Sequence, residues 1–178
     1  MQRVTLLSRL VLLVGVSLLF ISQSRAQTTK ITPEYIMTLF APLSADQAVD
    51  STLYISDVLT GGWVKGPKIK GILIGPGGDW LRVMPSGVAR IDVRATIKTD
   101  DGALIYLSYN GIFKDTKETE ERASKGEVLT SNDLYFMIAP TLQTSAKKYE
   151  WLNDVQCIGK MVEYKSESYV KYDIFAIR

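Results

Sequence analysis

The sequence predicts an all-β protein, and three observations support this fold class. About nine short runs alternate apolar and polar residues, or are continuously apolar, at the close spacing typical of antiparallel strands. Clusters of Gly, Pro, Asp, Asn and Ser separate most of these runs and indicate turns. A single segment favours a helix, and it is poorly amphipathic. A β-sandwich and a β-barrel both fit this pattern.

The clearest element is a hairpin over residues 88–113, in which two alternating runs flank a turn at residues 100–102. A two-residue turn would mix polar and apolar groups on both faces. A three-residue loop pairs Ile97 with Ile105 and separates the two kinds of side chain, so we expect this register. Gly102 supplies the left-handed residue that such a loop needs. One face is then apolar, and the other carries Asp92, Arg94, Thr96, Tyr106, Ser108 and Asn110.

The other strands follow from alternation and from the turn residues between them. The glycine-rich residues 75–80 lack the Lys-Ser/Thr and the following helix of a phosphate loop, so we interpret them as a tight turn. The expected strands cover residues 37–43, 52–58, 69–74, 81–84, 133–139, 155–164 and 169–177, with a loop at 140–148 and an aromatic turn at 149–153.

Residues 114–126 are charged throughout and have no apolar stripe. Asp115 and Thr116 are candidate helix caps, and Gly126 is a candidate stop. The segment therefore predicts a short solvated helix or excursion, with a surface for protein contacts as the alternative.

The first residues indicate a secretory signal peptide. Arg3 and Arg9 precede an apolar run over residues 10–20, and Ser24 and Ala26 are the small residues of a cleavage site. The apolar run is short for a spanning helix of ~20 residues, which favours cleavage over anchoring. We expect a signal peptide over 1–26, a disordered segment over 27–34 and one β domain over 35–178. The mature protein is then periplasmic or secreted, with no stable membrane anchor.

Composition excludes several classes of function. Without the predicted signal peptide, the 21 basic residues become 18 against 19 acidic ones, which does not favour nucleic acid as a partner. The chain has no histidine, so Ser-His-Asp triads and histidine metal sites are excluded, and we expect neither a metal nor a cofactor. The one cysteine, Cys157, lies in an apolar run and is interpreted as a small buried residue.

The stretches GGDWLRV, DVRATIKTDDGALIYLSYNGI, YFMIAPTLQT and YEWLN resemble the domain-of-unknown-function family numbered 3237, also called UPF0311. The resemblance covers roughly residues 37–177, and its most specific part is the block that ends in TDDGALIY. It implies a single antiparallel β-barrel of about eight to ten short strands, akin to the allene oxide cyclase and dirigent-type barrels. It implies no particular activity.

The recurrent positions of the family fall on a defined set of residues in this chain. Where family members often have Phe-Glu-Thr-Gly after Pro140, this chain has Leu-Gln-Thr-Ser, and Gln143 cannot act as an acid. The matching positions are Asp79, Trp80, Asp92, Arg94, Asp101, Gly102, Tyr106, Pro140, Thr144, Tyr149, Trp151 and Asn153.

The polar face of the hairpin is the first candidate site. If it lines the barrel interior, Asp92 beside Arg94 is a candidate base and Tyr106 a donor to a developing oxyanion, with Ser108 and Asn110 as ligand-binding neighbours. If it faces solvent, Asp92 and Arg94 form an ordinary surface ion pair. Apolar faces normally point inward, whereas the family positions cluster on this polar face, so both placements stay open.

Aromatic residues form a second candidate site. Trp80, Tyr149 and Trp151 are expected either to line the mouth of an apolar pocket or to plug the ends of the barrel. Asp79 and Asp101 are interpreted as turn residues that bond to their own backbone.

Three functions fit these features. The first is a carrier that binds a small hydrophobic or aromatic molecule in the barrel. The second is a cofactor-independent lyase, isomerase or cyclase that uses Asp92, Arg94 and Tyr106. The third is a structural module that makes protein contacts, and homo-oligomerisation is compatible with all three.

Overall fold

Strands β6 (Ala89–Thr99) and β7 (Leu104–Lys114) form the expected hairpin in the computed structural model, which describes residues 29–178. Ile97 lies opposite Ile105, and Gly102 has a φ of +86°. Both the register and the three-residue loop are therefore confirmed. The predicted signal peptide lies outside the described residues.

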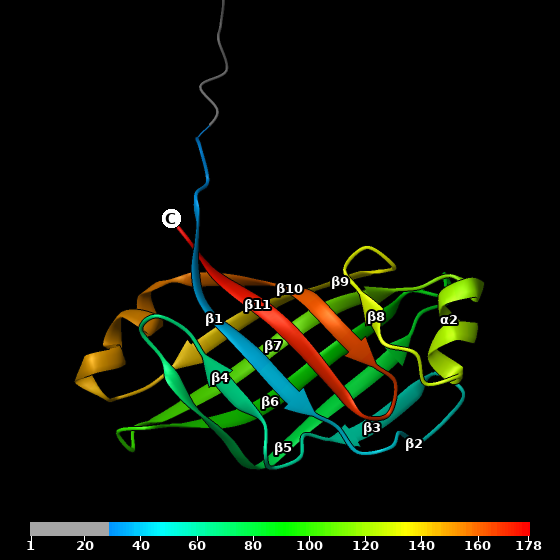
Figure 1. The fold of residues 1–178 in the computed structure, drawn as a ribbon, viewed down its shortest axis with the longest axis horizontal. Coiled ribbons are helices and arrows are strands. Elements are labelled where there is room, and N and C mark those ends of the chain that lie inside the picture. Colours follow the sequence, from blue (N-terminus) through cyan, green and yellow to red (C-terminus); the bar gives the residue numbers. More distant parts are fainter. Residues whose placement is uncertain (1–28) are drawn as a thin grey trace, which may run out of the picture. The chain divides into compact units, whose positions relative to one another are not determined.

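In the described part of the chain, eight strands close into one antiparallel β-barrel (Figure 1). Consecutive strands of the barrel are β5, β4, β1, β11, β10, β9, β7 and β6, and β6 pairs back with β5. The predicted barrel is thus confirmed. The bounds not yet given are β1 (Pro33–Pro42), β4 (Trp63–Lys65), β5 (Lys70–Val83), β9 (Tyr135–Gln143), β10 (Gln156–Lys165) and β11 (Tyr169–Ile177).

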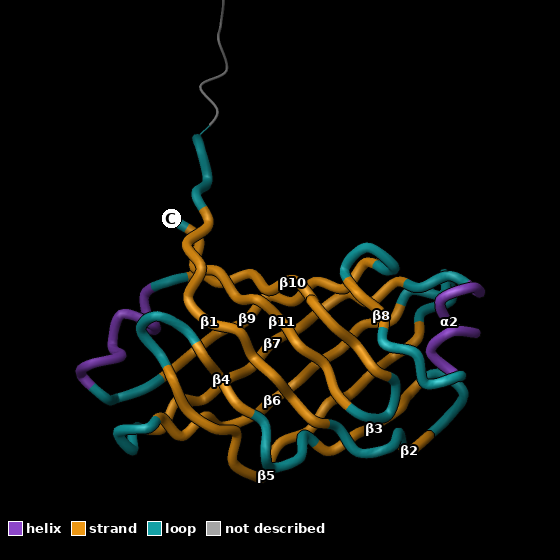
Figure 2. Tube along the Cα trace, viewed as in Figure 1, coloured by secondary structure: helices purple, strands orange, loops and turns teal. Residues whose placement is uncertain are grey.

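Three short strands extend this barrel, as the tube in Figure 2 shows. Strand β3 (Leu53–Asp57) pairs with the second half of β5, and β2 (Gln47–Ala48) pairs with β3. Strand β8 (Leu129–Thr130) pairs with the end of β10. The long strand β5 therefore has β4 beside its first half and β3 beside its second half.

Alternation along each strand fills the barrel interior with apolar side chains. On β6 the buried and more exposed residues alternate over its whole length. A fully buried Val, Leu, Ile, Phe or Met side chain stabilises the fold by about 1.5–3 kcal/mol, so this pattern determines which face points inward. The largest side chains of the core include Tyr172, Ile36, Met37, Leu39, Ile97, Ile105, Leu107, Leu142 and Met161.

The two ends of the barrel differ. A 3-10 helix, η1 (Lys147–Asp154), covers one end and buries Tyr149 and Leu152. The hydroxyl of Tyr149 donates to the carboxylate of Asp101, which ties η1 to the tip of the hairpin. We call this the closed end. Helix α2 (Lys117–Ser124) lies at the other end, which we call the open end (Figure 1).

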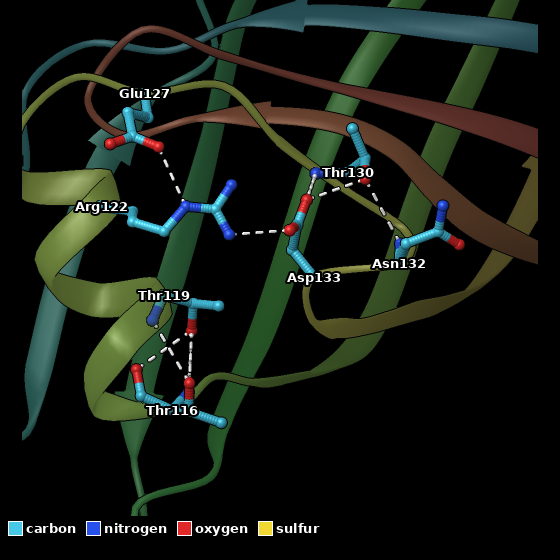
Figure 3. Close-up of polar contacts among 7 residues, drawn as sticks. All are labelled: Thr116, Thr119, Arg122, Glu127, Thr130, Asn132 and Asp133. Carbon is cyan, nitrogen blue, oxygen red and sulfur yellow. Dashed lines mark hydrogen bonds and ion pairs between the residues drawn. The ribbon is translucent and has the colours of Figure 1, made fainter.

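Helix α2 confirms the predicted short charged helix. Thr116 is its N-cap and forms a capping box with Thr119, and Gly126 after it has a φ of +75°. Figure 3 shows how Arg122 joins the helix to the following loop, with an ion pair of 2.9 Å to Glu127 and one of 2.8 Å to Asp133. Among the described residues, no helix has the length and hydrophobicity of a membrane span.

The structure corrects the interpretation of residues 75–80 as a tight turn. Strand β5 continues through them, since it pairs with β6 on both sides of this segment. Ile74 lies opposite Thr96 and Gly78 lies opposite Arg94, so the register shifts between these pairs. Three residues of β5, 75–77, thus face one residue of β6, Ala95, which is a β-bulge. The glycines suit this bulge, since a Cβ on Gly77 would lie 3.0 Å from the carbonyl oxygen of Arg94. The bulge keeps the next residue, Asp79, in strand conformation.

Two further boundaries differ from those expected. Strand β9 continues through residues 140–143, which the sequence indicated as loop, because they pair with β7. Strand β1 begins at Pro33, within the segment expected to be disordered. Its pairing with β11 and the ion pairs of Glu34 with Lys68 and Arg178 hold this segment in the barrel.

Candidate functional site

A cavity lies inside the barrel near the open end. Its volume is about 40 Å³ when measured over the positions that the centre of a water molecule can occupy, and its empty space is about 520 Å³ when the solvent-open mouth is included. The smaller volume corresponds to roughly two to four water molecules. We call it the barrel cavity, and it is lined by Leu43, Ser44, Asp46, Ser56, Asp79, Leu81, Ile91, Phe113, Phe136, Tyr164, Glu167, Val170 and Tyr172.

Asp79 is an acidic residue that strand β5 holds in the barrel cavity. It lies opposite Ser56 on β3 and opposite Val93 on β6, and Val93 is part of the core. Its Oδ1 atom is buried and has no hydrogen-bond partner among the described residues. A buried carboxylate oxygen without a donor is costly, so this atom retains an unused capacity to accept a hydrogen bond.

The protonation of Asp79 is unusual for a carboxyl group. Burial raises the pKa of Asp79 to about 7, and the negative charges of Asp46 and Asp92 add to this shift. Burial is the main cause because it removes water from the charged form, while like charges nearby disfavour the same form. Near neutral pH, Asp79 therefore exists in both its neutral and its ionised form.

Aromatic side chains make up the wall beside Asp79. The ring of Tyr172 lies 5.3 Å from that of Phe136 and 5.9 Å from that of Tyr109, both in edge-to-face geometry. Phe136 also packs against Phe113 at 4.9 Å. Burial raises the pKa of Tyr109 and of Tyr172 well above the usual value, so both phenols stay protonated near neutral pH.

Two polar segments contribute to the lining of the cavity. Asp46 precedes β2, and its carboxylate accepts a short hydrogen bond from the hydroxyl of Ser56. The hydroxyl of Ser44 accepts a hydrogen bond of 2.8 Å from the backbone N–H of Asp57, which fixes this segment against β3. Glu167, in the turn between β10 and β11, also lines the cavity.

The predicted catalytic residues lie elsewhere. Asp92, Arg94 and Tyr106 point outward from β6 and β7, with exposed side-chain fractions of 42% and 51% for the first two. Arg94 Nη1 and Asp92 Oδ1 are 2.8 Å apart in a surface ion pair, and the predicted cross-strand partners Ser108 and Asn110 lie beside them. Of the two placements left open by the sequence, the structure shows the solvent-facing one. These residues do not line the barrel cavity.

The three predicted aromatic residues do not form one pocket. Trp80 is 40% exposed on the outer face, with its ring centroid 6.0 Å from the Arg94 guanidinium. Tyr149 is buried at the closed end, and Trp151 is partly buried near Lys68. The plug interpretation therefore fits Tyr149, whereas the mouth of the cavity is built from other aromatic residues.

The position of Asp79 inside the barrel differs from the one predicted, because residues 75–80 belong to a strand and not to the expected turn. In a turn, a short acidic side chain bonds its own backbone, whereas in β5 this one points inward. The sequence does contain a signal for this position, because alternate residues of a strand share one face. Asp79, Leu81 and Val83 occupy alternate positions of β5, and Leu81 also lines the cavity. Asp101 lies in the turn after β6, and its carboxylate accepts hydrogen bonds from the side chains of Thr99 and Tyr149, whereas the sequence predicted a bond to its own backbone.

Two other groups have no part in this cavity. Cys157 is buried, and burial raises the pKa of its thiol to about 11. This agrees with the interpretation of Cys157 as a small buried residue. Within residues 29–178, no cluster of three or more His, Cys, Asp and Glu side chains could hold a metal ion.

The fold and the cavity define a class: a small closed antiparallel β-barrel with a titratable carboxyl group inside one end. A family model described as a protein of unknown function, DUF3237, matches residues 32–177. The chain therefore belongs to the DUF3237 family. It is 34% identical over 105 residues to a UPF0311 protein of Clostridium acetobutylicum, a match that covers 57% of this chain and 66%, just under two thirds, of that protein.

Solved structures show the same fold. A conserved protein of unknown function from Rhodopseudomonas palustris superposes with a TM-score of 0.77 at 24% identity, over 85% of this chain and 100% of the other. A β-barrel-like protein from Acinetobacter baumannii superposes with a TM-score of 0.70 at 28% identity, over 86% and 100%. The barrel is therefore shared with relatives of low sequence identity.

Proposed function

We propose that this protein binds a small hydrophobic or aromatic molecule at the open end of its barrel, with one polar group of the ligand bonded to Asp79. The observation that supports this most directly is the buried Oδ1 atom without a partner in a cavity lined mainly by apolar and aromatic side chains. Small-molecule sites commonly combine an apolar lining with a few polar groups that fix the orientation of the ligand.

The size of the cavity limits how such a ligand binds. Sites for drug-sized ligands usually have volumes of about 300–1,000 Å³. A cavity of about 40 Å³ admits only a compact group of roughly two to four heavy atoms. The apolar body of the ligand must therefore lie in the open mouth, among residues such as Phe113 and Phe136, or widen it.

A second candidate function is acid-base catalysis on the bound molecule. One observation favours it: a carboxyl group with a pKa of about 7 can accept or donate a proton near neutral pH. In this role Asp79 replaces the predicted base Asp92, and the buried phenol of Tyr172, which lines the same cavity, is a neighbouring donor. The reaction classes remain those predicted from the sequence, a lyase, isomerase or cyclase without a cofactor.

A thermal-shift screen with small aromatic and terpenoid-like compounds tests the binding proposal. A ligand at ~100 times its Kd stabilises the protein by about 2.7 kcal/mol, which raises the unfolding midpoint measurably. The matched variants are Phe136→Leu in the cavity wall and Tyr106→Ala on the outer face. A hit that Phe136→Leu weakens and Tyr106→Ala leaves unchanged supports the proposal. The reverse pattern would move the site to the outer face of the hairpin.

Product analysis separates a carrier from an enzyme. Any compound that binds is incubated with wild type and with Asp79→Asn, and the solution is analysed by mass spectrometry and NMR. Conversion by wild type that stops in the variant supports catalysis. A compound recovered unchanged after long incubation with wild type supports a carrier.

Export is proposed from the sequence of residues 1–26 alone. Expression of the whole chain with sequencing of the N-terminus of the product tests it. A product that begins at Gln27 supports cleavage, whereas one that retains Arg3 and Arg9 contradicts it.

A further inference from the structure

The barrel cavity has a pronounced charge imbalance. Three carboxyl side chains line it, those of Asp46, Asp79 and Glu167, and none of its lining residues is a Lys or Arg. Some carboxylates elsewhere among the described residues have a cationic partner: Asp101 pairs with Lys148, and Asp133 pairs with Arg122. The lining of the cavity provides no such partner for its three carboxyl groups.

The orphan oxygen of Asp79 defines where a positive group would bind. Asp46 already accepts a hydrogen bond from Ser56, whereas Oδ1 of Asp79 accepts none. An ammonium group carries three N–H donors, and a charge-assisted hydrogen bond to a carboxylate is roughly twice as strong as one between neutral groups. A cationic donor thus satisfies the hydrogen-bond requirement and the charge of Asp79 together.

The lining around Asp79 is also compatible with a cation. The side chains of Phe113, Phe136, Tyr164 and Tyr172 surround the same cavity. Aromatic faces attract ammonium groups through their quadrupole, and the attraction increases when the group is desolvated. A ligand carboxylate or phosphate, by contrast, would meet three acidic side chains without a compensating base.

We infer that the ligand is a small organic amine, an inference that rests on the proposed function. The ammonium group of the amine enters the barrel cavity and bonds Asp79, and its apolar body lies in the mouth. An ammonium has one heavy atom, which a cavity of about 40 Å³ can hold. Asp46 and Glu167 attract the amine to the mouth, and the aromatic wall contacts its carbon skeleton.

Amine binding is coupled to the ionisation of Asp79. The groups whose charge acts on Asp79 or that line the same cavity are Asp46, Asp92, Tyr109, Tyr164, Tyr172 and Glu167. Burial raises the pKa of each of these three tyrosines, so they stay neutral between pH 6 and 8. Over that range Asp79 changes its charge, because its pKa is about 7.

The direction of this coupling distinguishes an amine from a neutral ligand. An ammonium binds the ionised form of Asp79, so its affinity rises with pH, by up to tenfold per pH unit below the pKa of Asp79, and binding releases a proton. A neutral ligand that accepts a hydrogen bond from protonated Asp79 would show the opposite dependence.

Isothermal titration calorimetry with three probes of similar shape tests the inference on the purified protein. The probes are 2-phenylethylamine, 2-phenylethanol and 3-phenylpropionate, each titrated at pH 6 and pH 8 in two buffers of different ionisation enthalpy. We expect the amine to bind at least tenfold more tightly than the other two, more tightly at pH 8, and with proton release. Hexylamine and cyclohexylamine extend the series to aliphatic skeletons.

Variants assign the effect to Asp79. Asp79→Asn removes the charge with little change in shape and should weaken amine binding at least tenfold and abolish its pH dependence. Glu150→Gln removes an exposed carboxylate on η1, at the closed end, and should leave amine binding within twofold.

The outcomes separate this inference from the proposed function. If the alcohol binds more tightly than the amine, and Phe136→Leu lowers the affinity for the alcohol, the site is one for neutral apolar ligands. The inference that the ligand is an amine is then wrong. Amine binding that Asp79→Asn leaves unchanged would overturn the role of Asp79. If none of the five probes binds at either pH, the inference that the ligand is an amine is wrong. The broader compound screen would still test the proposal that the barrel binds a small molecule.

Discussion

Replacement of Asp79 by Asn should make the ligand-free protein more stable at pH 8 but not at pH 4. Oδ1 of Asp79 is buried without a donor, and burial raises the pKa of this carboxyl group from 3.8 to about 7. In the unfolded chain the same group ionises near its usual pKa. Between these two values the native state binds more protons than the unfolded state, so wild type loses stability as pH rises. Asn cannot ionise, so the stability of the variant does not fall with this ionisation as pH rises.

The size of the effect follows from the shift. From 3.8 to about 7 is roughly three units, and each unit corresponds to 1.36 kcal/mol, which gives about 4 kcal/mol for the full change between pH 4 and pH 8. For a domain of this size, 1 kcal/mol moves the unfolding midpoint by roughly 2–4 °C. The difference in midpoint between variant and wild type should therefore grow by about 8–16 °C over this range.

The assay is urea and thermal unfolding of both proteins at half-unit steps from pH 4 to 8.5, followed by circular dichroism. The packing of the new amide changes the free energy of unfolding by an amount that does not depend on pH. The test therefore uses only how the difference in unfolding free energy between Asp79→Asn and wild type changes with pH. Glu150→Gln provides the control for loss of one acidic charge and should parallel wild type. Curves for Asp79→Asn and wild type that run parallel over the whole range would refute a buried, ionisable Asp79.

Three further predictions concern other parts of the barrel. Gly102→Ala should cost about 1 kcal/mol in urea unfolding, because the φ of +86° disfavours a Cβ while nothing lies within 4 Å of it. Tyr149→Phe removes the hydroxyl that donates to Asp101 at 3.1 Å and should lower stability by about 1 kcal/mol, measured as a lower thermal midpoint. The buried thiol of Cys157, with its pKa raised to about 11, should react with a disulfide reagent at pH 8 roughly 100-fold more slowly in the native protein than in urea. Equal rates in both conditions would show that this residue is accessible.

Local pattern in the sequence was sufficient for several elements. The hairpin register followed from the separation of apolar and polar side chains, because a slip by one residue would move every side chain to the opposite face. The cap of α2 at Thr116 and its stop at Gly126 followed from hydrogen-bonding capacity and backbone freedom, which are properties of a few neighbouring residues. The similarity of four stretches to one family then distinguished a barrel from a sandwich.

The site required the tertiary structure. Asp92 and Arg94 met every local criterion for a polar site, and only closure of the sheet determined that their face points to solvent. Residues 75–80 contain glycines that fit a turn or a bulge equally well, and pairing with β6 decided for the bulge.

The content and alternation of the strands are thus encoded locally, because they depend on residues close together in the chain. The identity of the carboxyl group inside the barrel depends instead on how distant strands come together. Asp79 acquires its raised pKa from burial among strands far apart in sequence, such as β5, β7 and β11. Desolvation is a property of the closed barrel, and no local pattern around Asp79 specifies it.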